Sequence, residues 1–312
     1  MKLKNPRHGS MQFWPRKRAK KSVARVRSWA AHKDVKPLGF VGYKVGMAHM
    51  TGVDTKRKNA PVSWPVTIIE CPALKIYSIR FYNNKQPVGE VLNTKADAEL
   101  ARRLRVAKKS KKFEDITEFD SVRILAYTQP KLTTSGKKTP DVFELAIGGS
   151  CDDQLAWAKE NLEKEISVAD VFGDMTQVDA HAVTKGKGYQ GVIKRFGVSL
   201  KQKKSEKGQR SVGARSGGWK AQAHMMYRVA QPGQMGYHLR TEFNKLIVKV
   251  SDDVSEIARA GGFSGYGVVK NSYLIIRGSV GGARKRAITL TVASRPTKRV
   301  ANHGMDMQKV IV

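Results

Sequence analysis

Positive charge is gathered into three segments of this chain, and negative charge is almost absent from them. Residues 1–33 hold eleven Lys or Arg and no acid, residues 185–249 hold fifteen against two acids, and residues 277–312 hold eight against one. Residues 94–165 differ, because they hold fourteen bases and thirteen acids. A surface that faces only water normally mixes both signs, which describes the balanced segment and not the basic ones. We therefore expect the basic segments to contact phosphate and the balanced segment to face solvent.

The whole chain carries a net charge of +32 over 312 residues. Such a charge repels itself in a compact state unless a polyanion neutralises it, and nucleic acid does so while releasing condensed counterions. An anionic membrane would also attract the charge, but no apolar run approaches the roughly 18–20 residues that span a bilayer. The basic residues 1–8 are not followed by an apolar signal core. With 40% hydrophobic residues, the chain can still bury the core of one elaborated domain or two modest ones.

Neither a metal site nor a catalytic constellation can be assembled from the sequence. Cys71 and Cys151 are the only cysteines and are far apart, whereas a structural zinc site needs four ligands, usually in close pairs. The seven histidines are scattered and form no HExxH or HxH pattern, so each is expected to be an RNA contact or a packed ring. We predict no enzyme, no cofactor and no metal, and the two isolated thiols suit a reducing cytoplasm.

Two stretches look like extensions rather than parts of a packed domain. Residues 9–21 have no sustained apolar period, and their aromatic side chains stand beside arginine and lysine, a combination that can stack on bases and hold phosphates. We expect this arm to be ordered by RNA, with a localisation signal or a solubility tail as the alternative. Residues 199–219 are basic and rich in Gly and Ser, and a compact domain rarely carries about 20 such residues without a use for them. Trp219, at their end, is expected to face RNA, and local packing is the alternative.

The remaining pattern is mainly β and interrupted by a mixed segment. β-branched and aromatic runs punctuated by glycine predict strands, which suit a closed barrel. These strands are expected at 38–47, 65–71, 74–82, 121–127, 142–147, 178–184, 246–250, 266–277 and 288–293. Capping patterns predict helices that begin near Thr94, Ser150, Ser167 and Asp252.

One motif could suggest a nucleotide cofactor. Residues 186–191 match G-x-G-x-x-G after a strand-like run. A dinucleotide site also needs a following amphipathic helix and an acid about 20 residues on, but the helix is cut short at Gly197 and residue 211 is Ser. We interpret the motif instead as a tight Gly-rich turn whose backbone and neighbouring cations contact phosphate.

The motifs together resemble a known family. The strongest match is Phe172-(six)-Asp179-(two)-Ala182-x-Thr184-x-Gly186-Lys187-Gly188-(two)-Gly191-(three)-Arg195. It is joined in collinear order by segments 39–49, 217–219, 223–225, 233–241 and 278–286. The chain is similar to the universal large-subunit ribosomal protein three family in its archaeal or eukaryotic form.

The resemblance implies a fold and a role. The fold is a six-stranded barrel of the translation-protein type, with an inserted α/β subdomain and long basic extensions. The role is that of a structural, noncatalytic protein that binds large-subunit ribosomal RNA, acts early in assembly, and links the factor-binding region to the peptidyl transferase centre. The central extension would be a finger with Trp219 near its tip, and Gln234 would be the position that bacterial members methylate. Glu206 stands about where eukaryotic members have a modified histidine, which favours an archaeal source.

The predicted divisions and contacts follow from both lines of reasoning. The divisions are an arm (1–37), barrel segments (38–93, 178–198 and 241–300), the insert (94–177), the finger (199–240) and a tail (301–312). The candidate RNA-binding residues are Lys4, Arg7, Phe13, Trp14, Arg16, Lys17, Arg18, Lys20, Lys21, Lys185, Lys187, Lys194, Arg195, Lys201, Lys203, Lys204, Lys207, Arg210, Arg215, Trp219, Lys220, His224, Arg228, Gln234, His238, Arg240, Arg284, Lys285 and Arg286.

The expected partners are large-subunit ribosomal RNA and neighbouring large-subunit proteins, and neither a membrane nor DNA. Two other classes remain as alternatives: an RNA-modifying or nucleotide-dependent enzyme, and a free nucleic-acid chaperone or chromatin-type protein.

Overall fold

The computed structural model describes residues 9–54, 60–95, 97–105, 107, 109–116, 118–200, 204, 227–298 and 305–311. Two compact units are present. The smaller unit comprises residues 1–20 and 184–239, and the larger comprises residues 21–183 and 240–312. The chain thus leaves the larger unit once, after Val183, and returns to it at Arg240.

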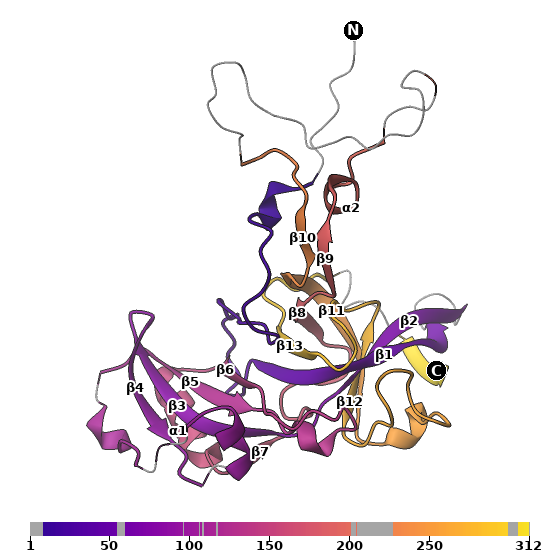
Figure 1. Ribbon diagram of the computed structural model, residues 1–312. Coiled ribbons are helices and arrows are strands. Elements are labelled where there is room, and N and C mark those ends of the chain that lie inside the picture. Colours follow the sequence, from indigo (N-terminus) through magenta and orange to yellow (C-terminus); the bar gives the residue numbers. More distant parts are fainter. Residues whose placement is uncertain are drawn as a thin grey trace, which may run out of the picture. The chain divides into compact units, whose positions relative to one another are not determined.

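Seven strands of the larger unit form one antiparallel sheet in the order β13-β8-β11-β12-β2-β1-β14 (Figure 1). Their bounds are β1 (Gly39–Asp54), β2 (Ala60–Glu70), β8 (Gln177–Val183), β11 (Leu239–Ser251), β12 (Tyr273–Arg277), β13 (Ala287–Val292) and β14 (Met305–Ile311). β13 also pairs with β1, from Gly39 opposite Thr291 to Tyr43 opposite Ala287. The pairings that run through β1, β2, β12, β11, β8 and β13 therefore return to β1.

The start of β1 is buried on both faces, and Trp29 and Leu145, which lie outside this circuit of pairings, approach it at Gly39. Phe40 and Tyr43 are fully buried. Between them, a Cβ atom at Gly42 would lie 2.5 Å from Ile69 Cγ2 of β2. Only glycine therefore allows β1 and β2 to approach so closely here. This explains the glycine-punctuated pattern of residues 38–47, which predicted the strand correctly but stopped it several residues early.

A second sheet lies in the same unit, in the order β4-β3-β5-β6, with β7 paired to β3. Its strands are β3 (Leu74–Asn83), β4 (Gln86–Leu92), β5 (Ser121–Tyr127), β6 (Val142–Ala146) and β7 (Glu165–Ile166). β3 and β4 lie within the predicted first barrel segment, 38–93, but β3 pairs with β5 of the insert and β4 pairs with β3. Alternating burial predicts a strand and not its partner, so these pairings could not be predicted from the sequence. One hydrophobic cluster nevertheless contains side chains of both sheets, including Phe40 and Phe81.

The helices are shorter than their capping patterns predicted. α1 (Cys151–Asn161) begins as expected at Ser150, whose hydroxyl accepts from Asp153 N while the Asp153 carboxylate accepts from Ser150 N. The other predicted helices are only single 3₁₀ turns at Ala98–Arg102 and Val254–Ile257, and a non-helical turn after Ser167. Further 3₁₀ turns are Met11–Phe13, Phe113–Asp115 and Pro130–Leu132.

Two elements near the C-terminus differ from their predictions. The expected strand 266–277 begins only at Tyr273, because the preceding loop is bonded to the buried Glu70 carboxylate instead of to a neighbouring strand. The predicted tail, 301–312, contains β14, which pairs with the end of β1 from His49 to Asp54. Its polar alternation gave no strand signal that could be separated from a solvated tail.

The smaller unit is built on a two-stranded ribbon. β9 (Gly186–Gln190) pairs with β10 (Gly233–Gly236), and α2 (Val192–Phe196) follows β9 and ends at Gly197 in the left-handed conformation. The G-x-G-x-x-G motif is therefore a strand and not the predicted tight turn. The helix after the motif has five residues and ends at Gly197, as the sequence predicted. β10 also lies within the predicted finger, 199–240, so the end of that segment is paired strand.

Candidate nucleic-acid interface

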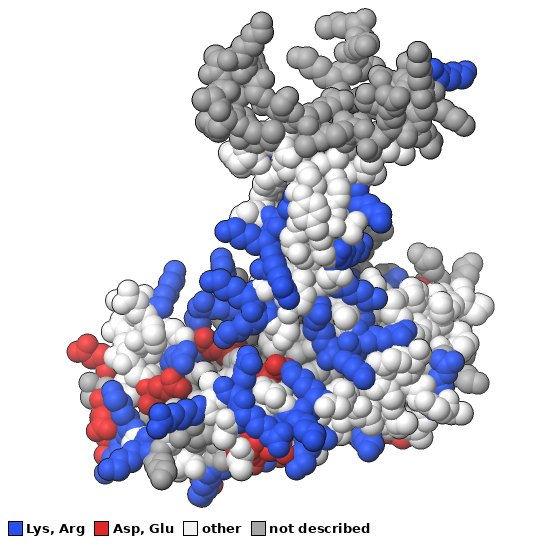
Figure 2. Space-filling model, viewed as in Figure 1, with Lys and Arg blue, Asp and Glu red and all other residues white. Residues whose placement is uncertain are grey.

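The described part of the smaller unit carries positive charge without any negative charge. Ten Lys or Arg lie within residues 9–20, 184–200, 204 and 227–239, and these ranges contain no Asp or Glu. Figure 2 shows the same contrast on the face that it draws: blue side chains flank the ribbon of β9 and β10, and most red ones lie over the part of the larger unit that holds β3–β6. Without internal counter-charges, the unit presents a field that attracts a polyanion.

The arm is held against this ribbon by backbone and buried side-chain contacts. Ala19 N donates to Tyr237 O at 2.8 Å, and His238 Nδ1 lies 2.8 Å from Lys17 O. His238 is 8% exposed, so this predicted RNA contact is a packed ring that fixes the arm. The turn beside it requires glycine, because a Cβ atom at Gly236, where φ is +73°, would lie 2.1 Å from Lys185 O.

Trp14 also has a packing role. Its ring lies 5.6 Å from the Phe196 ring and 6.4 Å from the Tyr227 ring, centroid to centroid, in tilted and edge-on arrangements. Base stacking by Trp14 stays a prediction, and its ring already has two packing partners within this unit. Phe13, its neighbour, remains 44% exposed.

Two predicted phosphate ligands point inward. Arg195 donates from Nε to Gln234 O at 3.0 Å and from Nη1 to Gln231 O at 2.7 Å, and burial lowers the pKa of its guanidinium. Arg16 lies over the Phe196 ring at 4.1 Å and donates to Arg195 O. These arginines tie the arm, α2 and β10 together, and nothing in the local sequence distinguishes them from cations that face outward.

The other predicted cations of this unit that the structure describes are exposed. They are Lys17, Arg18, Lys20, Lys185, Lys187, Lys194, Lys204 and Arg228. Arg18 is the one among them with a ring beneath it, at 5.3 Å from the Tyr237 centroid. Gln234, half-buried in β10, donates its amide to Gly236 O at 3.0 Å. Ten predicted contacts lie outside the described residues: Lys4, Arg7, Lys201, Lys203, Lys207, Arg210, Arg215, Trp219, Lys220 and His224.

A second basic group lies on the larger unit around a hollow of about 200 Å³. It is lined by Ser22, Lys137, Arg284, Lys285, Arg286 and Ala287. The loop that carries the three consecutive cations is fixed from below by the buried Lys44, which donates from Nζ to Val280 O and, at 3.4 Å, to Gly282 O.

The hollow includes one cation that was not among the predicted RNA contacts. Lys137 comes from the insert and was not predicted to contact RNA, although the basic pair 137–138 after Gly136 could have indicated it. Its ammonium is paired with Asp141, so it is partly neutralised. Lys21, also predicted, is exposed on this unit, and Arg240 is half-buried with its pKa lowered by desolvation.

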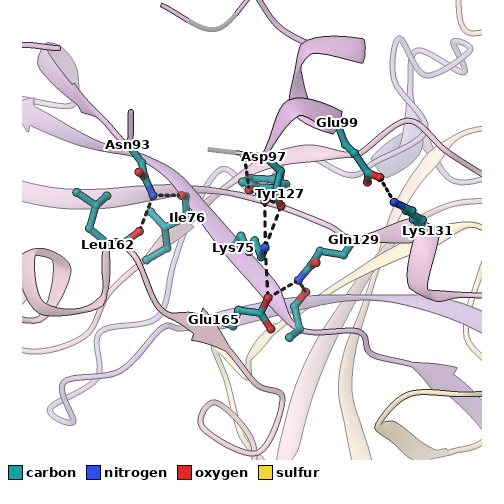
Figure 3. Close-up of polar contacts among 11 residues, drawn as sticks. Lys75, Ile76, Asn93, Asp97, Glu99, Tyr127, Gln129, Lys131, Leu162 and Glu165 are labelled. Atoms are coloured by element: carbon teal, nitrogen blue, oxygen red, sulfur yellow. Dashed lines mark hydrogen bonds and ion pairs between the residues drawn. The ribbon is translucent and has the colours of Figure 1, made fainter. Parts of the chain in front are cut away.

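The second sheet and its neighbouring loops pair their charges with one another (Figure 3). Lys75 Nζ lies 3.0 Å from Asp97 Oδ2 and 3.4 Å from Glu165 Oε1, and the Tyr127 hydroxyl donates to Asp97 at 3.0 Å. Burial raises the pKa of Tyr127 to about 12, so its hydroxyl stays protonated.

The same pattern continues around this cluster. Lys131 pairs with Glu99 at 2.9 Å, and the Asn93 amide bonds to the carbonyl oxygens of Ile76 and Leu162. Such a surface has little charge left for a polyanion, in agreement with its balanced composition.

Other kinds of site find no support in the described part of the chain. Within it, no three His, Cys, Asp or Glu side chains come together as a metal site, and no helix combines the length and the apolar character of a membrane span.

Comparison with known proteins agrees with the sequence resemblance. The family model described as Ribosomal protein L3 matches residues 1–310. The protein named large ribosomal subunit protein uL3 of Archaeoglobus fulgidus is 43% identical over 96% of this chain and 94% of its own length. The proteins of that name from Methanocaldococcus jannaschii and Pyrobaculum calidifontis are 41% and 42% identical, over 95% and 96% of this chain and 93% and 94% of their own lengths. These relatives are archaeal ribosomal proteins and not enzymes, and the chain belongs to the ribosomal protein L3 family.

Proposed function

We propose that this chain is a structural constituent of the large ribosomal subunit that binds large-subunit ribosomal RNA in the cytoplasm. The observation that carries the proposal is the charge of the smaller unit, whose described residues include ten cations and no acid. A ribbon with few buried side chains cannot be a stable core of its own, so contact with RNA supplies what it lacks. Affinity comes mainly from phosphate contacts and shape, with little readout of base edges.

The parts of the chain have different roles. The circuit of strand pairings in the larger unit supports a closed six-stranded barrel of the translation-protein type, which docks on folded RNA. The insert, whose ion pairs leave little net charge, faces solvent or neighbouring large-subunit proteins. The basic residues that line the hollow at 284–286 bind RNA backbone phosphates.

The finer assignments rest on the family resemblance. The extension 199–240 reaches toward the peptidyl transferase centre with Trp219 near its tip, and the chain acts early in assembly and couples the factor-binding region to the catalytic RNA. Gln234 is the candidate for methylation.

Salt dependence tests the RNA-binding role directly. Each phosphate contact contributes about −0.9 on duplex RNA or −0.7 on a single strand to the log–log slope of affinity against salt. Replacing the exposed Lys17, Lys20 and Lys194 by Gln should reduce the slope by roughly 2–3. A matched variant that replaces Lys95, Lys131 and Lys164, each paired with a glutamate, should leave the slope unchanged.

Co-sedimentation separates this function from its rivals. The chain purified from its own cells should travel with the large subunit, whereas a free chaperone or an RNA-modifying enzyme should not. Equal slopes for both triple variants, or absence from purified large subunits, would refute the proposal.

A further inference from the structure

Tyr189 is the most exposed large hydrophobic side chain in the described part of the chain. It lies in β9, and 75% of its surface is accessible. Among the other described aromatic side chains of this unit, Trp14 contacts Phe196 and Tyr227, and Tyr237 lies beneath Arg18, while Phe13 is 44% exposed. A phenol ring held out from a strand by a structured ribbon has large apolar faces that still lack burial.

Two glycines near Tyr189 leave open space beside its ring. A Cβ atom added at Gly188 or at Gly191 would meet no atom within 4 Å, so the space on both sides of Tyr189 along the chain is open. Opposite it in the ribbon lies Gln234, whose amide is bonded back to the carbonyl oxygens of Met235 and Gly236. A flat group can therefore approach the ring without displacing a side chain that packs on it.

Exposed cations stand close to the ring. Lys187 precedes it by two residues, with Gly188 in the left-handed conformation between them. Lys185 and Lys194 are exposed on the same ribbon and helix, and no described acid of this unit competes with them. An exposed aromatic ring with cations at this spacing is the arrangement with which proteins hold an unpaired nucleotide, by its base and its phosphate.

We propose that Tyr189 stacks on an unpaired base of ribosomal RNA while Lys187 binds a phosphate next to that base. The inference rests on the proposed RNA-binding function and adds to it one contact that is aromatic instead of ionic. Any of the four bases can stack in this way, so the contact fixes the position of the ribbon on a looped-out nucleotide and does not read sequence.

The test compares substitutions in the full-length chain bound to large-subunit ribosomal RNA transcribed from the same genome. Loss of a base stack corresponds to about 5- to 140-fold weaker binding for Tyr189→Ala. Tyr189→Leu, which keeps apolar bulk without a π face, should weaken binding nearly as much, and Tyr189→Phe should bind like the unchanged chain. None of these substitutions should alter the salt slope, whereas Lys187→Ala should reduce it by about 0.7–0.9.

Chemical probing of the RNA supplies a second readout. One nucleotide should be protected by the unchanged chain and by Tyr189→Phe and become reactive with Tyr189→Ala. Val88, an exposed apolar residue of the larger unit, provides the control. Val88→Ala should change neither the affinity for the RNA nor the chemical reactivity of that nucleotide.

Several outcomes would overturn the inference. Equal affinity of Tyr189→Ala and the unchanged chain would do so, as would normal binding by Tyr189→Leu. Normal binding to naked RNA combined with poor incorporation into subunits would assign the ring to a protein partner instead. A lowered melting temperature for Tyr189→Ala would make it a structural residue. Failure of the unchanged chain to bind RNA would instead refute the proposed function itself.

Discussion

The carboxylate of Glu70 gives the sharpest quantitative prediction about the fold. It is fully buried at the end of β2 and accepts four hydrogen bonds from the loop before β12. Oε1 accepts from Lys270 N at 2.9 Å, from Asn271 N at 3.1 Å and from Asn271 Nδ2 at 2.7 Å, and Oε2 accepts from the Tyr266 hydroxyl. Burial, together with this carboxylate, strongly raises the pKa of Tyr266, so the hydroxyl remains a donor.

Glu70→Ala removes all four acceptor contacts and leaves the donors inside the protein. Hydrogen bonds to charged groups contribute about 1.5–3 kcal/mol each, but the two loop amides can regain water if the loop opens. A net loss of about 3–5 kcal/mol is therefore expected, comparable to the loss of one partner of a buried charge pair. For a domain of this size, that corresponds to a fall in melting temperature of roughly 6–20 °C.

Glu70→Gln tests the geometry behind this magnitude. An amide oxygen can keep the three N–H donors of Oε1, and its NH₂ group can donate to the Tyr266 oxygen, so the expected loss is only about 1–2 kcal/mol. Glu163→Ala, which breaks an exposed ion pair with Lys95, is the control and should cost less than about 1 kcal/mol.

Urea unfolding followed by tryptophan fluorescence and thermal melting are the measurements. A loss for Glu70→Ala no larger than that for Glu163→Ala would show that the network does not hold the loop.

Three further predictions concern the ribbon, the half-buried His181 and the finger. Gly236→Ala should open the ribbon of β9 and β10, because the new Cβ atom collides with Lys185 O. Gly188→Ala, whose Cβ atom meets nothing, should cost only about 1–2 kcal/mol of backbone strain. Limited proteolysis should therefore cut the smaller unit of Gly236→Ala and spare that of Gly188→Ala. Burial lowers the pKa of His181 in the folded protein below the ordinary histidine value of 6.5. The unfolded chain therefore binds more protons as the pH falls below 6.5, and the free energy of unfolding should decline there. The His181→Gln variant should show less of this decline, and a pH profile identical to that of the unchanged chain would contradict the prediction. Trp219→Ala should leave the melting temperature of the isolated chain almost unchanged and still impair translation by ribosomes that carry it; a fall of many degrees would make Trp219 a core residue, and normal translation would remove the functional content of the finger.

Charge and family motifs were enough to identify the class of this protein. The one-signed segments 1–33 and 185–249 indicate a polyanionic partner whatever the fold, because charge is a property of composition. Strands with buried, β-branched runs, such as Ser121–Tyr127, could also be located closely from sequence, since period-two burial is a local signal.

The tertiary structure alone decided which strands pair and which cations face the solvent. Alternation could not show that β3 pairs with β5, that the Gly-rich motif forms β9, or that a polar tail becomes β14, since pairing joins residues far apart in sequence. The same holds for the candidate interface. Arg195 and Lys194 are adjacent cations in the sequence, but the first donates to two backbone carbonyl oxygens and the second is exposed. Which of two neighbouring side chains faces inward depends on the direction of the short helix that carries them and on what packs against it, and neither is written in the local sequence.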